Sequence, residues 1–199
     1  GMIQRGFHQT SDKFTVPDHI TTNGQTYSDA TTHGDEHWTL AGILEQSSNV
    51  GMIIAAEKMS NEQRYEFISK FGIGQDNGLG LPGEADGLLY SADQWDLRTQ
   101  NTVLFGQAYT TNALQLTNAV AVIANKGVKK PQRSIKAISD AEGHSEEQKP
   151  EGEATRVIDE QVASQVMNAM ESVSDHYSQF IKVDGYRVAA KSGTAEVAG

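Results

Sequence analysis

The sequence predicts a mainly helical α+β fold. Residues 40–56, 60–71, 111–125 and 159–173 carry apolar side chains at the three- and four-residue spacing of a helix face. Only two segments, 132–139 and 186–198, have the composition expected of strands. Nothing in the 199 residues repeats and no linker divides them, so we expect one domain spanning residues 1–199.

The first half of the chain is predicted to start irregular and then become helical. Residues 1–37, rich in Thr, Asp, Gly and His, show no regular pattern and are expected to be irregular. Residues 40–56 are expected to form two helices joined at Ser47–Asn49, because three poor helix formers stand there in a row. Ser60 and Gln63 have the spacing of a capping box, which predicts a third helix ending near Gly72.

The second half alternates polar loops with two further helices. Residues 72–87 are dense in glycine and are predicted to be a loop. Residues 111–125 give the clearest helical pattern in the chain, and Gly127 is expected to end that helix. Residues 140–155 are polar and acidic, so we expect a mobile loop there. Asp159 is expected to cap the last helix.

Composition and charge exclude several functions. The formal net charge is −10 and no cluster of Lys and Arg stands out, so nucleic acid is not expected as a partner. The chain has no cysteine, which excludes disulfides and cysteine-based zinc sites. No apolar run approaches the roughly 18–20 residues of a membrane-spanning helix. His33 and His37 stand four residues apart beside acidic residues, but no third ligand is evident, so no metal is expected. The glycines of residues 71–80 lack the G-x-G-x-x-G spacing and follow no strand, so no dinucleotide cofactor is expected.

Two short motifs point to acyl-transfer chemistry when they are taken together. One is the S-x-N motif of Ser47 and Asn49, and the other is the K-S-G-T run that begins at Lys191. With S-x-x-K, motifs of these two kinds form the signature of serine β-lactamases and penicillin-binding proteins. Each motif alone is weak, because a capping turn and an edge strand with a solvated lysine explain them equally well.

Four longer blocks make the signal more specific. In chain order they read LAGILEQSSNVGM (40–52), GLGLPGE (78–84), TTNALQLTNAVAVIANKG (110–127) and VDGYRVAAKSGTAE (183–196). From about residue 40 to residue 199 the chain therefore resembles the transpeptidase domain of a class B penicillin-binding protein of the cell-division or elongation type. The second and third blocks favour this family over serine β-lactamases, which share only the short motifs.

The resemblance implies a role for each motif residue. Ser47 matches the serine that relays a proton between the lysine of S-x-x-K and the leaving group. Asn49 matches the asparagine that hydrogen-bonds that lysine and the substrate backbone, and Lys191 matches the lysine that supplies positive charge near the S-x-N serine. Ser192 and Thr194 match the hydroxyls that hold the terminal carboxylate of the substrate, and Gly193 matches the glycine that leaves room for the acyl group. The Thr194 N–H is also implied to be an oxyanion donor.

The chain departs from the family pattern in one respect: it contains no S-x-x-K. No serine is followed by a lysine three residues later, and the nearest imitation is Thr10 with Lys13. In the family, S-x-x-K lies at the start of a long buried helix and comes before S-x-N in the chain. We therefore expect the nucleophile upstream of Gly1. We expect an incomplete transpeptidase fold, namely a helical subdomain plus one K-[ST]-G strand, which is inactive alone and is not acylated by penicillin.

The resemblance also implies function, location and partners. The whole protein is expected to be a peptidoglycan D,D-transpeptidase that takes the D-Ala-D-Ala end of a stem peptide and is trapped by β-lactams. It would act outside the cytoplasmic membrane, anchored by segments absent here. A non-catalytic sensor or scaffold module and, less favoured, a serine β-lactamase are the alternatives. The exposed edge of a strand over 186–198 could pair with a second copy, which would give a strand-mediated dimer.

Overall fold

The computed structural model describes residues 1–80 and 82–193 of the chain. Its helices are α1 (Leu40–Glu45), α2 (Asn49–Ala55), α3 (Asn61–Lys70), α4 (Thr99–Thr102), α5 (Ala113–Ala124), α6 (Glu160–His176) and α7 (Ser178–Ile181), with single 3₁₀ turns η1 (Ala92–Gln94) and η2 (Val103–Phe105). Its strands are β1 (Lys13–Val16), β2 (His19–Thr22), β3 (Gln25–Ser28), β4 (Glu36–Thr39), β5 (Val128–Lys129), β6 (Ala137–Ser139), β7 (Ser145–Glu147) and β8 (Thr155–Arg156). The prediction of a mainly helical α+β fold is confirmed.

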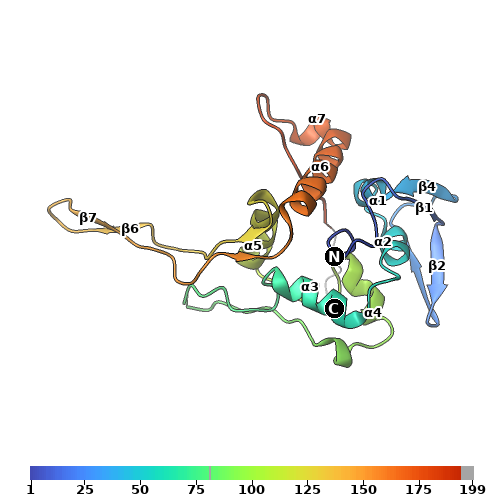
Figure 1. Ribbon diagram of the computed structural model, residues 1–199, viewed down its shortest axis with the longest axis horizontal. Helices are drawn as coiled ribbons and strands as arrows, with labels where there is room; N and C mark the ends of the chain where they lie inside the picture. Colours follow the sequence, from blue (N-terminus) through green and yellow to red (C-terminus); the bar gives the residue numbers. More distant parts are fainter. Residues whose placement is uncertain (81, 194–199) are drawn as a thin grey trace.

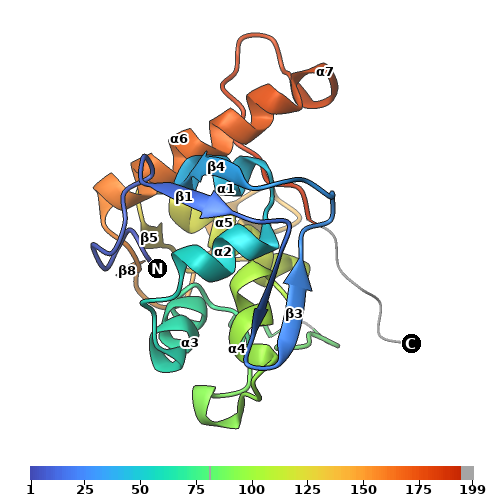
Figure 2. The same ribbon diagram turned by 90° about the vertical axis from the view of Figure 1, so that its right-hand side faces the viewer.

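The strands pair as four separate antiparallel ribbons: β1 with β4, β2 with β3, β5 with β8, and β6 with β7. Figure 2 shows β1 and β4 lying across α1, while α6 runs along the other side of α1. One buried cluster lies under this layer and comprises Val16, Leu40, Ile43, Val50 and Ala55. A second cluster joins α5 to α6 and comprises Val122, Ile158 and Ala163.

The predicted helices are confirmed, and so is the predicted capping box at Ser60. Ser60 Oγ accepts the N–H of Gln63, and the Gln63 side chain accepts the N–H of Ser60, so α3 begins with a complete capping box. Asn112 Oδ1 accepts the N–H of Gln115 at the start of α5. Asp159 precedes α6 as predicted, although its side chain makes no capping hydrogen bond.

The prediction that residues 1–37 are irregular is wrong. This segment forms β1, β2, β3 and the start of β4. β2 and β3 are joined by Asn23 and Gly24, which have φ values of 52° and 73°. A two-residue turn with positive φ at both positions matches the twist of the strands that it joins, so Asn-Gly is a strong hairpin signal. These strands are short and polar, which is why periodicity alone misses them.

The loop predicted over residues 72–87 is irregular wherever the structure describes it. A buried glutamine on α5 fixes both of its ends, because Gln115 Nε2 donates to Gln75 O and to Asp86 O, each at 2.6 Å. The block 110–127 therefore holds the glycine-rich block 78–84 through the backbone carbonyls of residues on either side of it.

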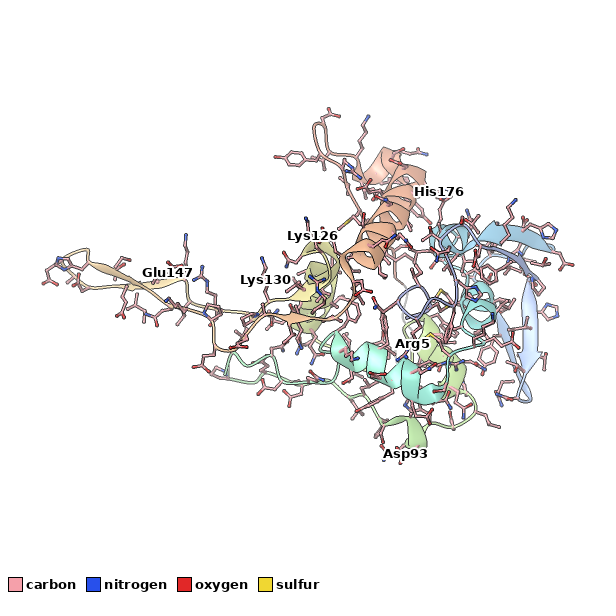
Figure 3. All side chains as sticks on the ribbon, viewed as in Figure 1. Arg5, Asp93, Lys126, Lys130, Glu147 and His176 are labelled. Carbon is pink, nitrogen blue, oxygen red and sulfur yellow. The ribbon has the colours of Figure 1, made fainter. Side chains whose placement is uncertain are left out.

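The acidic segment 140–155 contains regular structure, which corrects the prediction of a plain loop. β7 lies inside it and pairs with β6, so that the two strands form a hairpin closed around Asp140–Gly143. This hairpin projects far from the rest of the protein (Figure 1). In Figure 3, Glu147 lies out on this arm and Lys126 lies near its base. The prediction of a strand over 132–139 holds only for its last three residues.

The closing strand predicted over residues 186–198 does not form in the part that the structure describes. Residues 186–193 are irregular, and residues 194–198 lie outside the described residues. A strand exists only as part of a hydrogen-bonded ladder, and no described strand lies beside this segment. The segment is tied to α6 by the bond from Ala190 N to Met170 O and by Arg187, which donates from Nε and Nη2 to Glu171 Oε2. The expected strand-mediated dimer therefore has no strand edge to rest on within residues 186–193.

We predict that Gly127→Ala destabilises the protein much more than Gly143→Ala. Both glycines have a left-handed backbone, with φ of 84° and 88°, so each alanine costs about 1 kcal/mol in backbone energy. At Gly127 the new Cβ would also overlap the carbonyl of Ile158, which adds about 1–3 kcal/mol, whereas Gly143 has no atom within 4 Å of that position. Urea unfolding measures both free energies, and equal losses would contradict the packing at Gly127.

Candidate functional site

Ser47 lies at the sharp turn between α1 and α2. The N–H groups of Ser47 and Ser48 donate back to Leu44 O and Ile43 O, which closes α1. Ser47 itself has a left-handed backbone with φ of 56°, which is unfavourable for a side chain with a Cβ. The turn directs Ser47 to the surface and buries Ser48, so the two neighbouring serines have different environments.

Ser48 begins α2. Its backbone is extended and its Oγ accepts the N–H of Gly51 at 2.8 Å, which is the bond of an N-terminal cap. Gly51 is required here because a Cβ at that position would come within 2.8 Å of Ile43 side-chain carbons and 3.0 Å of Ser48 Oγ. The helix joint predicted at Ser47–Asn49 is confirmed, and within it the cap of α2 is Ser48.

The structure brings Lys191 to Ser47 from the far end of the chain. Lys191 Nζ donates to Ser47 Oγ at 2.7 Å, although 144 positions separate the two residues. The same ammonium donates to the carbonyl of Ser192 at 2.8 Å. Partial burial of Lys191 lowers its pKa below the ordinary lysine value. The S-x-N serine and the K-S-G lysine thus form one polar contact at the protein surface.

Helix α6 positions Lys191. The N–H of Ala190 donates to Met170 O near the middle of α6, and α6 packs against α1. The two helices are joined by Ser172 Oγ, which donates to Glu45 Oε2 at 2.6 Å. His176, labelled near the end of α6 in Figure 3, lies 3.7 Å from the same carboxylate. The lysine reaches Ser47 because both are held by this pair of helices.

The other predicted site residues are placed less closely. Asn49 Nδ2 donates to the carbonyl of Ser28 at 3.3 Å, so in this structure its amide faces β3 rather than Lys191. Ser192 Oγ lies 3.4 Å from Lys191 Nζ, and the space where Gly193 would carry a Cβ is open. Thr194, predicted to hold a carboxylate and to donate its N–H, lies outside the described residues.

An apolar hollow of about 300 Å³ adjoins the lysine. It is lined by Val173, Tyr177, Phe180, Ile181, Ala190, Lys191 and Ser192. An apolar wall beside a cation and a hydroxyl suits a ligand with a small apolar side chain and a carboxylate. The carboxylate is the part of such a ligand that the family resemblance assigns to the K-S-G run.

The nearest imitation of S-x-x-K has the wrong setting for a nucleophile. Lys13 starts β1 and is exposed, and the carbonyl of Thr10 accepts the N–H of Ala41. Thr10 and Lys13 therefore do not lie on a helix, whereas the motif requires one turn of a helix to bring hydroxyl and amine together.

Sequence reasoning missed Asp29, a buried carboxylate behind the turn. Asp29 accepts hydrogen bonds from Ser48 Oγ, from the N–H of Val50 and from His33 Nε2. The only sequence signal is the four-residue spacing from Asp29 to His33, within a segment that shows no periodicity. His37, the other histidine considered for a metal, contacts Thr15 Oγ1 instead. Across residues 1–80 and 82–193, no three His, Asp or Glu side chains gather as a metal site.

Comparison with known proteins agrees with this geometry. Residues 2–199 match the family described as the penicillin binding protein transpeptidase domain. The chain is 32% identical to the peptidoglycan D,D-transpeptidase FtsI of Escherichia coli over 99% of this chain and 32% of that protein. The chain spans about a third of the length of the curated relatives that it matches.

Two solved structures show the same fold. A peptidoglycan synthetase from Bifidobacterium adolescentis is 71% identical with a TM-score of 0.95, over 100% of this chain and 36% of that one. Penicillin-binding protein 3 of Mycobacterium tuberculosis, complexed with aztreonam, is 33% identical with a TM-score of 0.81, over 94% of this chain and 41% of that one. The chain therefore belongs to the transpeptidase-domain family of class B penicillin-binding proteins, as its four ordered blocks predict.

Proposed function

We propose that the chain forms the S-x-N and K-[ST]-G side of the active site of a peptidoglycan D,D-transpeptidase. The observation that carries this proposal is the 2.7 Å contact between Lys191 Nζ and Ser47 Oγ. A cation that donates to a serine hydroxyl makes that hydroxyl a better proton donor, as a relay to a leaving amine requires. The name of the E. coli relative supports the same reaction.

The proposed reaction is acyl transfer in two steps. A serine of an S-x-x-K motif, which these 199 residues lack, attacks the carbonyl between the last two residues of a D-Ala-D-Ala stem peptide. The serine gives its proton to the lysine of the same motif, the C–N bond breaks as that proton passes through Ser47 to the terminal D-Ala amine, and an ester remains on the nucleophilic serine. The amine of a second stem peptide then attacks the ester, which releases the serine and completes the cross-link.

Lys191 and Ser192 are proposed to bind the substrate carboxylate. The ammonium and the hydroxyl lie 3.4 Å apart and are both exposed, so one carboxylate could accept from both. Thr194 is proposed as a third donor and Gly193 as the position that leaves room for the acyl group. Asn49 is proposed to reach the S-x-x-K lysine and the substrate backbone once its amide leaves Ser28. The aztreonam complex of the M. tuberculosis protein supports β-lactams as a second class of ligand.

The proposed location is the outer face of the cytoplasmic membrane, where peptidoglycan is cross-linked. Within the described residues, no helix has the length and apolar character needed to span a membrane. A membrane anchor in another part of the full-length protein is included in this proposal.

Fluorescent penicillin tests this function directly. The full-length protein is expected to be covalently labelled on a denaturing gel, and the 199-residue chain alone is expected to remain unlabelled because it has no S-x-x-K serine. Labelling of the isolated chain would refute the assignment of the nucleophile to another segment. An unlabelled full-length protein would favour a non-catalytic sensor or scaffold.

The two neighbouring serines provide a matched pair of variants in the full-length protein. Ser47→Ala should slow acylation by penicillin roughly 100-fold or more, because the proton relay is lost, with little change in unfolding free energy. Ser48→Ala should lower the unfolding free energy by about 2 kcal/mol or more, because α2 loses its N-terminal cap and the buried Asp29 carboxylate loses the Ser48 hydroxyl. It should slow acylation less than Ser47→Ala does, because the relay hydroxyl is kept. Labelling rates and urea unfolding separate the two effects. If Ser47→Ala is acylated at the wild-type rate, Ser47 is not the proton relay.

A further inference from the structure

Asp29 is a buried anchor behind the S-x-N turn. It follows β3 directly, and its side chain is only 7% exposed. Its Oδ1 accepts the N–H of Val50 at 2.9 Å, and its Oδ2 accepts Ser48 Oγ at 2.5 Å and His33 Nε2 at 3.0 Å. Burying a carboxylate is costly unless it is hydrogen-bonded and paired, and Asp29 meets both conditions.

These contacts fix the turn that presents Ser47. Ser48 and Val50 lie on either side of Asn49, so the carboxylate holds both neighbours of Asn49. The left-handed backbone of Ser47 costs about 1–2 kcal/mol, and such a conformation persists only where its surroundings enforce it. Asp29 supplies that enforcement although it touches neither Ser47 Oγ nor Lys191 in the structure.

His33 contacts Asp29 in a way that requires a positive charge. Its Nδ1 lies 2.6 Å from the carbonyl oxygen of Gly34, and its Nε2 lies 3.0 Å from Asp29 Oδ2. Both partners are acceptors, and a neutral imidazole carries only one N–H, so only the imidazolium can donate to both. The side chain is 13% exposed and packs beside the ring of Trp38 at 5.0 Å.

The groups around His33 favour that charge. Asp18 Oδ1 accepts the backbone N–H of His33 at 3.1 Å, and His19 lies 3.5 Å from Asp18 on the exposed side. The hydrogen bond to Asp29 raises the pKa of His33, with smaller contributions from the Gly34 carbonyl and from the charges of Asp29 and Asp18. The imidazolium therefore persists above the ordinary histidine pKa of about 6.5.

We propose that Asp29 and His33 are positioning residues, which hold the Ser47–Asn49 turn so that acylation depends on the protonation of His33. The inference rests on the proposed transpeptidase function. Loss of the proton removes one of the two hydrogen bonds of His33 and weakens its hold on Asp29, which is then free to release Ser48 and Val50. Ser47 would lose its fixed position relative to Lys191.

The direction of the pH effect follows from the raised pKa. The stabilisation is complete below the unfolded-state pKa of about 6.5 and is lost as pH rises through the higher pKa of the folded protein. The acylation rate constant should therefore fall at a pH above about 6.5, in a step caused by deprotonation of His33. Burial also lowers the pKa of Lys191, so a variant must separate the effects of the two groups.

The test measures the acylation rate constant and the noncovalent dissociation constant of fluorescent penicillin with the full-length protein, from about pH 5.5 to about pH 9. His33→Gln should lower the acylation rate constant about ten- to hundredfold at the acidic end and should lack the His33 step, with little change in the dissociation constant. His144→Gln is the matched control. His144 also contacts an aspartate four residues away, Asp140 at 2.9 Å, but it is exposed on the β6–β7 hairpin, so this variant should keep the wild-type profile.

The outcomes distinguish failure of the positioning role from failure of the transpeptidase function. If the wild type is labelled but its pH profile has the same steps as that of His33→Gln, the positioning role is overturned and the transpeptidase proposal stands. An unlabelled wild type would overturn both. If His33→Gln unfolds, Asp29→Asn keeps the shape and one acceptor, so it should fold and acylate more slowly than wild type. Wild-type rates for Asp29→Asn would overturn the proposal.

Discussion

The packing of α6 against α1 is the contact on which the candidate site depends. Lys191 has no strand to hold it within the described residues, and its backbone is tied to α6 by the bond from Ala190 to Met170. Ser47 stands at the end of α1, and Glu45 on that helix accepts the hydroxyl of Ser172 on α6. A change that separates these helices would therefore part Lys191 from Ser47 without altering either residue. The chemistry of the site is a consequence of a helix–helix interface.

Helix positions were predictable from the sequence because each helix carries its own evidence. The capping box at Ser60 and the apolar face of 111–125 are local patterns, and local patterns survive in the folded chain. The N-terminal strands were missed because β2 and β3 are four residues long and polar, and their one strong signal was the Asn23-Gly24 turn. As a hairpin signal, that dipeptide predicts a strand on each side of it.

The site depends on long-range contacts, which local patterns cannot predict. Nothing in the spacing of Ser47 and Lys191 says that they meet, and only the resemblance of the ordered blocks to a family placed them together. Asp29 had no such support, since a single aspartate in a polar segment looks like a turn residue. Its importance comes from burial and from three donors that converge on it, and both are properties of the folded protein.

The order of residues in Ser47-Ser48-Asn49 follows from backbone geometry. A left-handed residue followed by an extended one turns the chain sharply, so successive side chains point in different directions. The extended residue is the one whose hydroxyl can reach the helix N–H groups, and Ser48 Oγ accepts from Gly51 there. The left-handed residue points outward, where Lys191 can reach it. Ser47 could not take the place of Ser48 as the cap, because α2 starts one residue too late for the Ser47 hydroxyl to reach its N–H groups. The strained backbone of Ser47 thus directs its hydroxyl outward beside a capped helix, where it accepts from Lys191, and the buried carboxylate of Asp29 maintains that conformation.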